Sequence, residues 1–414
     1  MRSEAAKPKR PGRSGRINAD EAARRLGVRR ETVYAYVSRG LIRSEAQGGT
    51  RERLYHREDV EALVRRRQGR RDPARAAADA LSWGAPVLES ELTLIRDGEL
   101  YYRGEPAETL AASSTFEDVA GLLWGRLPEA GIPDALPSLP RSWTRWSALL
   151  AGLPPLERFQ VALAATGAGD AGAYDTSPAA VHRTGAAVLR LLAGVAIGAE
   201  PSRAPIAELL QRGWVPKQPR TRAAIEAALI LWADHELNVG TFTVRCVASA
   251  HATPYAAVSA GLSALRGGLH GGATERVEAL FDEAQSPPRV RAALEARLRR
   301  GERIPGFGHH LYPDGDPRAN ALLAHVRSLR PKARALALAD SIERESVALI
   351  GHRPNIDFAS VSLRRVFDLP LGSTLALVAV GRCAGWIAHV LEQYRAGRLI
   401  RPRARYVGPP PRDE

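Results

Sequence analysis

The chain has 414 residues, 45% hydrophobic and 25% charged, which is ordinary for a soluble globular protein and long enough for two or three domains. No uncharged apolar run approaches the roughly 18 to 20 residues of a membrane-spanning helix, and the basic amino terminus lacks the apolar core of a secretory signal. Cys246 and Cys383 are too few for a disulfide framework or a structural zinc site, so we expect a cytoplasmic protein.

The formal net charge of +14 is concentrated at the amino end. Residues 1–75 hold 21 Lys and Arg against 10 Asp and Glu, whereas the other 339 residues hold 38 against 35. This asymmetry favours a polyanion-binding appendage on a nearly neutral body. A solubilising basic tail gives the same charge, and we expect residues 1–15 to be such a disordered tail.

Residues 17–40 have the pattern of two short helices joined by a glycine turn. Asn18 is predicted to cap the first helix, with Glu21 as its capping-box partner, and Gly27 to end it. A second helix is expected from about Arg30 to Ser38. The inward-facing residues are predicted to be Ala22, Ala23 and Leu26 in the first helix and Val33, Tyr36 and Val37 in the second.

Residues 16–67 resemble the winged helix-turn-helix domains of mercury-resistance regulators and excisionases, since a Gly48-Gly49 tip is followed by a strand ending at Leu54-Tyr55 and a helix from about His56. The resemblance implies that the second helix lies in the major groove of duplex DNA. The residues expected to meet DNA are Arg29, Arg30, Thr32, Tyr34, Arg39, Arg51 and Arg53. A small arginine-rich module that binds protein, or nothing, has the same pattern, because the chain contains only four lysines.

Residues 68–82 are interpreted as a linker or a short connecting helix, and Asp97-Gly98 predicts a β-hairpin. Beyond it the sequence is helical almost to its end. Several segments show helical periodicity or are apolar nearly all round, as in buried helices: residues 116–127, 156–167, 179–198, 222–236 and 373–397. We therefore expect a mainly α, large all-α domain over residues 83–408. No P-loop and no GxGxxG motif occurs.

Four clusters of polar residues interrupt this apolar pattern. They centre on His235, on His270, on the segment from Ile304 to Arg318, and on Asp357. Taken singly, most have an ordinary explanation, because a histidine beside a buried helix is usually a core residue and glycine pairs usually mark turns. His270 differs: glycines surround it, and a helix expected from about Ala273 would keep its imidazole neutral and able to donate to an enolate.

In order along the chain, the motifs LHGGA, GFGHxxYxxxDPR and NxDF, preceded by DHELN, resemble the citrate synthase family over about residues 90–408. The resemblance implies large and small helical subdomains, the small one approximately residues 255–365, and a homodimer that condenses an acyl-CoA with oxaloacetate. It implies three catalytic residues: His270 stabilises the acyl-CoA enol or enolate, Asp357 removes the α-proton, and His309 polarises the oxaloacetate carbonyl. The residues implied to bind oxaloacetate are His235, Arg318, Arg382 and Arg401, the last from the neighbouring subunit.

Coenzyme A is expected to meet the backbone of the loop formed by Ile304, Pro305, Gly306 and Phe307. We expect backbone contacts and no arginine side chain there, because His310 stands where many members of the family carry arginine. No spacing of residues suggests a metal ion, and acetyl-CoA is expected to serve as a co-substrate with no further cofactor.

Three functions remain open on the sequence. The first, which we predict, is an acyltransferase of the tricarboxylic acid cycle, a citrate synthase that uses acetyl-CoA. The second is a 2-methylcitrate synthase that uses propionyl-CoA, since one methylene in the acyl pocket decides between them and is worth roughly 1–3 kcal/mol. The third is a DNA-binding transcription regulator whose synthase-like domain senses a metabolite. Asp357 favours the enzymes, because a sensor needs no base.

Overall fold

The computed structural model describes residues 16–46, 53–57, 59–61, 63–64, 88–126, 131–267, 272–409 and 411. Several predictions lie outside these residues: the tail at 1–15, the Gly48-Gly49 tip, Arg51, the linker at 68–82 and His270. The chain divides into two compact units, Met1–Glu89 and Ser90–Glu414, each with a hydrophobic cluster of its own.

The amino-terminal unit contains two helices and a small antiparallel sheet of order β1-β3-β2. Its elements are β1 (Arg16–Ile17), α1 (Ala19–Leu26), α2 (Arg30–Ser38), β2 (Ser44–Ala46) and β3 (Arg53–His56), after which Arg57 and residues 59–61 are helical. The two predicted helices are therefore confirmed. The strand runs one residue beyond its predicted end, because His56 pairs with Arg16 of β1 and its ring contacts Glu45 at 3.1 Å.

The ends of α1 follow the sequence signals in all but one respect. The Asn18 side chain accepts a hydrogen bond from the Glu21 amide at 2.9 Å, and Gly27 has the left-handed φ of 61° that terminates the helix. The capping box itself is wrong, since the Glu21 carboxylate accepts from Arg25 one turn later at 2.8 Å. A full charge on the neighbouring turn is a stronger partner than the backbone amide.

The predicted inward face of this unit is also confirmed. Val33 is buried, and Tyr36 and Val37 pack against the same cluster. The buried members are Ile17, Ala22, Ala23, Leu26, Val33, Ile42, Tyr55 and Val60.

The carboxy-terminal unit opens with the predicted hairpin, β4 (Thr93–Arg96) and β5 (Glu99–Tyr102), to which β6 (Glu105–Pro106) adds a short third strand. Asp97 and Gly98 have φ of 54° and 82°, the left-handed pair that a two-residue turn requires. Tyr102 points inward, and its hydroxyl donates to the Ile230 carbonyl at 3.0 Å. The hairpin is thereby fixed to the end of a core helix.

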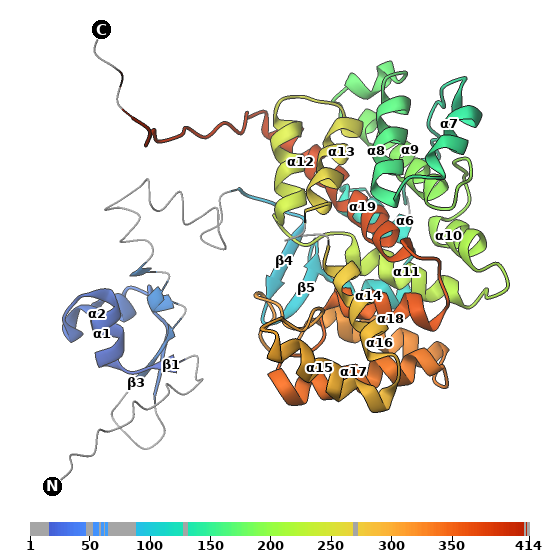
Figure 1. Cartoon of the computed structure of the whole chain (residues 1–414). Coiled ribbons are helices and arrows are strands. Elements are labelled where there is room, and N and C mark those ends of the chain that lie inside the picture. The colour runs from blue at the N-terminus through green and yellow to red at the C-terminus, as the bar shows by residue number, and fades with distance from the viewer. Residues whose placement is uncertain are drawn as a thin grey trace. The chain divides into compact units, whose positions relative to one another are not determined.

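The rest of this unit is almost entirely helical, as predicted. Figure 1 shows α8, α9, α12 and α13 gathered at one end, α15 to α18 at the other, and α19 running between them. The helices are α5 (Ala107–Ser113), α6 (Phe116–Leu123), α7 (Trp143–Leu150), α8 (Pro155–Gly167), η2 (Ala171–Tyr174), α9 (Pro178–Ala196), α10 (Ile206–Trp214), α11 (Thr221–Trp232), α12 (Val239–Ser249), α13 (Pro254–Leu265), α14 (Ala273–Ala284), η3 (Pro287–Arg289), α15 (Val290–Arg299), α16 (Pro317–Leu329), α17 (Arg334–Ile350), α18 (Ile356–Val366) and α19 (Ser373–Ala396).

The central helix α19 lies against α11 at unusually close range. A Cβ on Gly385 would lie 2.3 Å from the Ala233 carbonyl oxygen, and one on Gly381 would lie 2.8 Å from that of Leu229. Among the described helices, α19 alone is long and apolar enough to cross a membrane, yet 89% of its most apolar window is buried inside the unit. It is therefore placed as a core helix, and the close packing brings Arg382 beside the end of α11.

Candidate active site

The loop that carries His309 is fastened to the segment that precedes α18. The Gly308 amide donates to the Arg353 carbonyl at 2.9 Å, and the Asn355 amide donates to the Gly306 carbonyl at 2.9 Å. The Asn355 side chain donates to the Gly308 carbonyl and also caps α18 by accepting from the Asp357 amide at 3.1 Å. One asparagine therefore joins the histidine loop to the turn that holds the acid.

Gly306 shows why this loop needs glycine. Its φ is 84°, and a Cβ there would lie 2.9 Å from Val277 and 3.0 Å from the Cβ of Phe358. The ring of the following Phe307 packs at a tilt against that of Phe358, with ring centroids 5.0 Å apart. The loop is consequently pressed onto α18 and α14.

The imidazoles of His235 and His309 meet edge to face, with ring centroids 5.1 Å apart. Burial and the nearby charges of Arg318 and Arg382 hold the pKa of His235 well below its usual value. Burial, assisted by Arg318, lowers the pKa of His309 to about 4. Both rings are therefore neutral near pH 7.

The tautomer of His309 follows from one contact. Its Nδ1 accepts a hydrogen bond from the Leu311 amide at 3.1 Å, so the proton of the neutral ring lies on Nε2. His235 in turn contacts the Tyr312 hydroxyl through Nε2 at 3.0 Å. His309 is thus a neutral hydrogen-bond donor, which is what a carbonyl oxygen acquiring charge requires.

Arg318 is held rigidly at the start of α16. Its guanidinium donates two hydrogen bonds to the Asp316 carboxylate, both of 2.9 Å, and both side chains are buried. Asp316 also caps α16 and accepts from the Ile356 amide at 3.0 Å. Because Ile356 precedes Asp357, the same carboxylate connects the arginine to the turn that holds the acid.

Arg382 is buried beside Arg318. The two guanidinium carbons lie 5.5 Å and 5.8 Å from the ring centroid of Trp232, which they share. Burial lowers the pKa of Arg382, with the Asp234 carboxylate opposing the shift. Its Nη1 has no hydrogen-bond partner among the described residues. A buried guanidinium nitrogen without a partner points to an anion that completes it.

Asp357 lies in the first turn of α18 and is only partly exposed. Burial raises its pKa to about 6, although the charge of Arg318 acts in the opposite direction. It is therefore a stronger base than an ordinary carboxylate and is still ionised at pH 7.

The structure brings five of the predicted residues into one environment: His235, His309, Arg318, Asp357 and Arg382. The charge of Arg318 acts on both histidines and on the acid. The predicted coenzyme A loop adjoins them, with Ile304 buried and Phe307 partly buried. The two arginines and the two neutral imidazoles can bind a dianion, and the carboxylate beside them can act as a base. Among the described residues, no group of three His, Cys, Asp or Glu side chains is arranged to hold a metal ion.

Two predicted residues are not joined to this group. Arg401 is exposed, in the described segment 397–409, which contains neither helix nor strand and extends from the body in Figure 1. His270 lies outside the described residues.

Three other residues belong to the site, but the sequence predicted no role for them: Trp232, Tyr312 and Asp316. The signal for Tyr312 and Asp316 was present, because both stand at fixed positions in the motif that contains His309. Trp232 ends an apolar helix directly before the His235 cluster, and nothing local to it indicates that it will contact two arginines.

Residues 80–403 match the family described as citrate synthase, C-terminal domain. The chain belongs to the citrate synthase family. A citrate synthase of Mycolicibacterium smegmatis is 34% identical over 339 residues, which cover 76% of this chain and 90% of that one. A 2-methylcitrate synthase of Mycobacterium tuberculosis is 33% identical over 335 residues, covering 75% and 84%.

Solved structures agree with this assignment of the family and the fold. The citrate synthase of Thermoplasma acidophilum is similar, with a TM-score of 0.68 at 27% identity, covering 80% of this chain and 96% of that chain. That structure is a ternary complex with carboxymethyl coenzyme A and oxaloacetate. The predicted mainly α synthase fold is confirmed.

The amino-terminal unit contains a helix-turn-helix domain, since residues 17–68 match that family. Most of the side chains expected to meet DNA are exposed: Arg29, Tyr34, Arg39 and Arg53, with Thr32 partly so. Arg30 is exposed as well, but it forms an ion pair with Asp20 of α1. Its charge is therefore partly neutralised within the unit.

Proposed function

We propose that this member of the citrate synthase family condenses acetyl-CoA with oxaloacetate and water, giving citrate and coenzyme A. One observation carries the proposal: Arg318, buried beside Arg382, acts on two neutral imidazoles and on a carboxylate whose pKa is raised to about 6. A dicarboxylate that contains a ketone matches the cations and the donors, and an acidic carbon placed beside it matches the base.

In the proposed reaction, Asp357 removes a proton from the methyl group of the thioester. The charge that develops on the thioester oxygen is assigned to His270, which lies outside the described residues. The sequence places His270 among glycines and just before α14, where a neutral imidazole is favoured.

The enolate carbon then attacks the oxaloacetate ketone, and a carbon–carbon bond forms. His309 donates from Nε2 to the ketone oxygen as it becomes an alkoxide, and His235 hydrogen-bonds the same substrate. Arg318 and Arg382 hold its carboxylates, since each guanidinium can donate two parallel bonds. Water subsequently cleaves the citryl thioester and releases coenzyme A.

The first experiment follows free thiol released by the purified protein from acetyl-CoA in the presence of oxaloacetate. We expect turnover in the wild type and a loss of about a hundredfold or more in Asp357→Asn, because the base is removed while the shape is kept. Asp314→Asn is the matched control, since Asp314 is an exposed acid in the His309 segment. The proposal would be contradicted if the protein turned over neither acetyl-CoA nor propionyl-CoA.

A 2-methylcitrate synthase is the second candidate, and the similarity to the Mycobacterium tuberculosis enzyme of that name favours it. The two substrates differ by one methylene, so the ratio of their kcat/KM values decides between them. A ratio above about ten in favour of propionyl-CoA would replace the first proposal with this one.

We also propose that the helix-turn-helix domain binds duplex DNA, so that the chain joins an enzyme to a DNA-binding module. Exposed arginines on and beside α2 support this, because they can reach phosphates. A regulator without catalysis is the remaining alternative, and DNA binding together with absent thiol release would favour it.

The assembly we propose is a homodimer in which Arg401 reaches the oxaloacetate site of the neighbouring subunit. Its exposure on an extended segment supports this placement. Mixing Arg401→Gln with Asp357→Asn tests it: heterodimers that regain thiol release have one intact site built from both chains. Absence of any recovery in verified heterodimers would contradict the shared site.

A further inference from the structure

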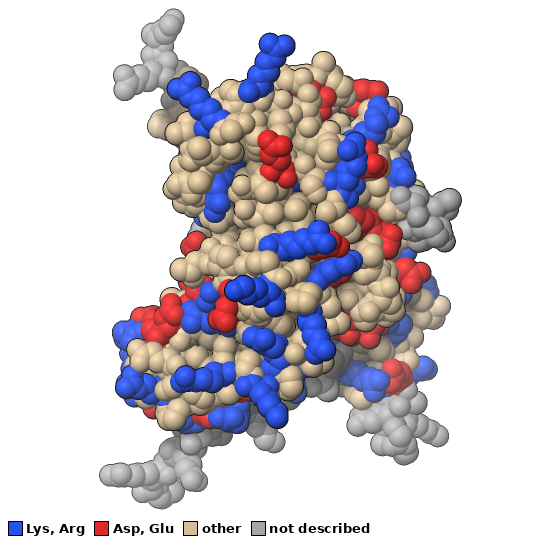
Figure 2. Space-filling view, turned by 90° about the vertical axis from the view of Figure 1, so that its right-hand side faces the viewer, with Lys and Arg blue, Asp and Glu red and all other residues tan. Residues whose placement is uncertain are grey.

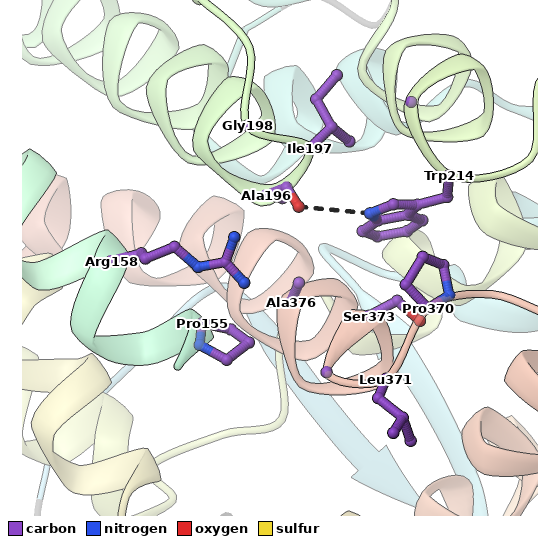
Figure 3. A pocket seen from close by; sticks show the side chains of 12 residues that line it. Pro155, Arg158, Ala196, Ile197, Gly198, Trp214, Pro370, Leu371, Ser373 and Ala376 are labelled. Carbon is purple, nitrogen blue, oxygen red and sulfur yellow. Dashed lines mark hydrogen bonds between the residues drawn. The ribbon is translucent and has the colours of Figure 1, made fainter. Parts of the chain in front are cut away.

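A separate cavity of about 240 Å³ lies where α19 begins, and none of the residues proposed to bind substrate lines it. Its walls come from the start of α8, the end of α9, the end of α10 and the turn before α19. Figure 3 shows Arg158 reaching into it from one side and the Trp214 ring facing it from the other.

One end of this cavity is polar and positive. The helix α19 is 24 residues long, so its amino end carries a positive partial charge, although the Ser373 amide itself donates to the Pro370 carbonyl at 3.1 Å. Ser373 is only 3% exposed, lines the cavity, and its hydroxyl has no hydrogen-bond partner among the described residues. The Nε of Arg158 likewise has no partner there.

The other wall is flat and apolar. The Trp214 indole is fixed by a hydrogen bond from its Nε1 to the Ala196 carbonyl at 3.4 Å, drawn as a dashed line in Figure 3. Pro370 lies beside this ring, Ile197 and Pro155 add further apolar lining, and no acidic side chain is among the lining residues. The cavity is therefore suited to a flat apolar body that carries one negative group.

We propose that this cavity binds a small organic monocarboxylate. The carboxylate accepts hydrogen bonds from Arg158 and from the Ser373 hydroxyl at the positive amino end of α19, while the apolar body lies against Trp214. The ligand supplies the partner that a buried hydroxyl and a guanidinium both lack, which is the physical reason to expect it.

Benzoate, with benzamide as the neutral match, tests this proposal on the full-length protein by isothermal titration calorimetry. Both titrations are made with and without saturating oxaloacetate. We expect benzoate to bind at least about tenfold more tightly than benzamide, because the charged group strengthens each hydrogen bond. Arg158→Gln and Ser373→Ala are each expected to weaken benzoate binding by about tenfold, and Arg145→Gln, an exposed arginine of α7, to leave it unchanged.

Three results would overturn the proposal. The first is equal affinity for benzoate and benzamide, or no binding of either at millimolar concentration. The second is wild-type affinity in the folded Ser373→Ala and Arg158→Gln proteins, with folding checked by circular dichroism. The third is displacement of benzoate by oxaloacetate, which would place the binding in the substrate site.

Discussion

The two units use arginine in opposite ways. In the amino-terminal unit the described arginines that we expect to meet DNA are exposed, whereas the carboxy-terminal unit buries Arg190, Arg245, Arg318 and Arg382. Exposed guanidinium groups attract a polyanion over distance and are screened by salt. Buried ones act through fixed, desolvated hydrogen bonds. The same side chain therefore suits a phosphate backbone in one unit and a small dicarboxylate in the other.

Within the carboxy-terminal unit, the buried arginines separate structural from ligand-binding roles. Arg190 donates to the Pro133 carbonyl at 2.7 Å, Arg245 to Glu392 at 2.8 Å, and Arg318 to Asp316. Arg382 is the exception: Arg190 leaves only Nε without a partner, whereas the guanidinium of Arg382 forms no hydrogen bond or ion pair with the described residues. On the surface of this unit, Figure 2 shows charges of both signs interspersed over one face. The exception at Arg382 is what supports its proposed contact with the substrate.

The largest effect is expected from removing a buried arginine. Arg318→Gln leaves the Asp316 carboxylate buried without its charge partner, and should lower the free energy of unfolding by about 3–5 kcal/mol. Arg203→Gln, which breaks the exposed pair with Asp134, should cost less than about 1 kcal/mol. Urea unfolding followed by tryptophan fluorescence measures both, since no tryptophan precedes residue 83. Equal losses would remove the contrast between buried and exposed arginines.

Salt should separate the two proposed binding functions. If four phosphates are neutralised, DNA affinity falls roughly a hundredfold between about 50 and 200 mM salt. The KM for oxaloacetate should change less than about threefold over that range, because buried groups are poorly screened. Fluorescence anisotropy with labelled duplex DNA and thiol-release kinetics in the same buffers measure the two. DNA binding that ignores salt would argue against the arginine set around α2.

The effect of pH is expected to be smaller than that of salt, and it should differ between catalysis and DNA binding. Asp357 must be ionised to act, and its pKa is raised to about 6, so kcat/KM for the acyl-CoA should fall about tenfold per unit below that pH. A raised pKa also means that the ionised carboxylate destabilises the fold, so Asp357→Asn should gain stability over wild type as pH rises through 6. In the amino-terminal unit, the hydrogen bond from Arg30 lowers the pKa of Asp20, and DNA binding should stay level from pH 5 to 7. A kcat/KM profile that is flat down to pH 5 would exclude Asp357 as the base.

The smallest changes in stability are expected when the asparagine that caps a helix is replaced in each unit. Asn18→Ala removes one hydrogen bond at the start of α1 and should cost the amino-terminal unit about 1 kcal/mol. Asn355→Ala should cost about 2 kcal/mol and also lower kcat, since Asn355 caps α18 and holds the Gly308 carbonyl. Amide hydrogen exchange in α1 and thiol release, respectively, measure these changes. If Asn355→Ala keeps full activity, the joined loops do not position the acid.

Local signals accounted for the elements of both units. Asn18 and Gly27 bounded α1, Asp97-Gly98 produced the hairpin turn, and the apolar run after residue 373 became the core helix. The Glu21 capping box failed because a competing partner, Arg25, lay on the next turn. Periodicity and turn chemistry are properties of neighbouring residues, so a sequence can display them directly.

The identities of the candidate site residues were legible in the motifs, because their order along the chain is itself a pattern. The contacts among them were not. Three features depend on how the chain folds. The Nε2 proton of His309 follows from the Leu311 amide, and the Asp316 carboxylate binds both Arg318 and the turn before Asp357. The Nη1 of Arg382 is left without a partner among the described residues. Nor does any local pattern mark the cavity beside Ser373, whose walls come from four separate segments. The sequence by itself determined which groups are present and which helices carry them, while burial and through-space charge, which set their pKa values and partners, arise only when the helices pack.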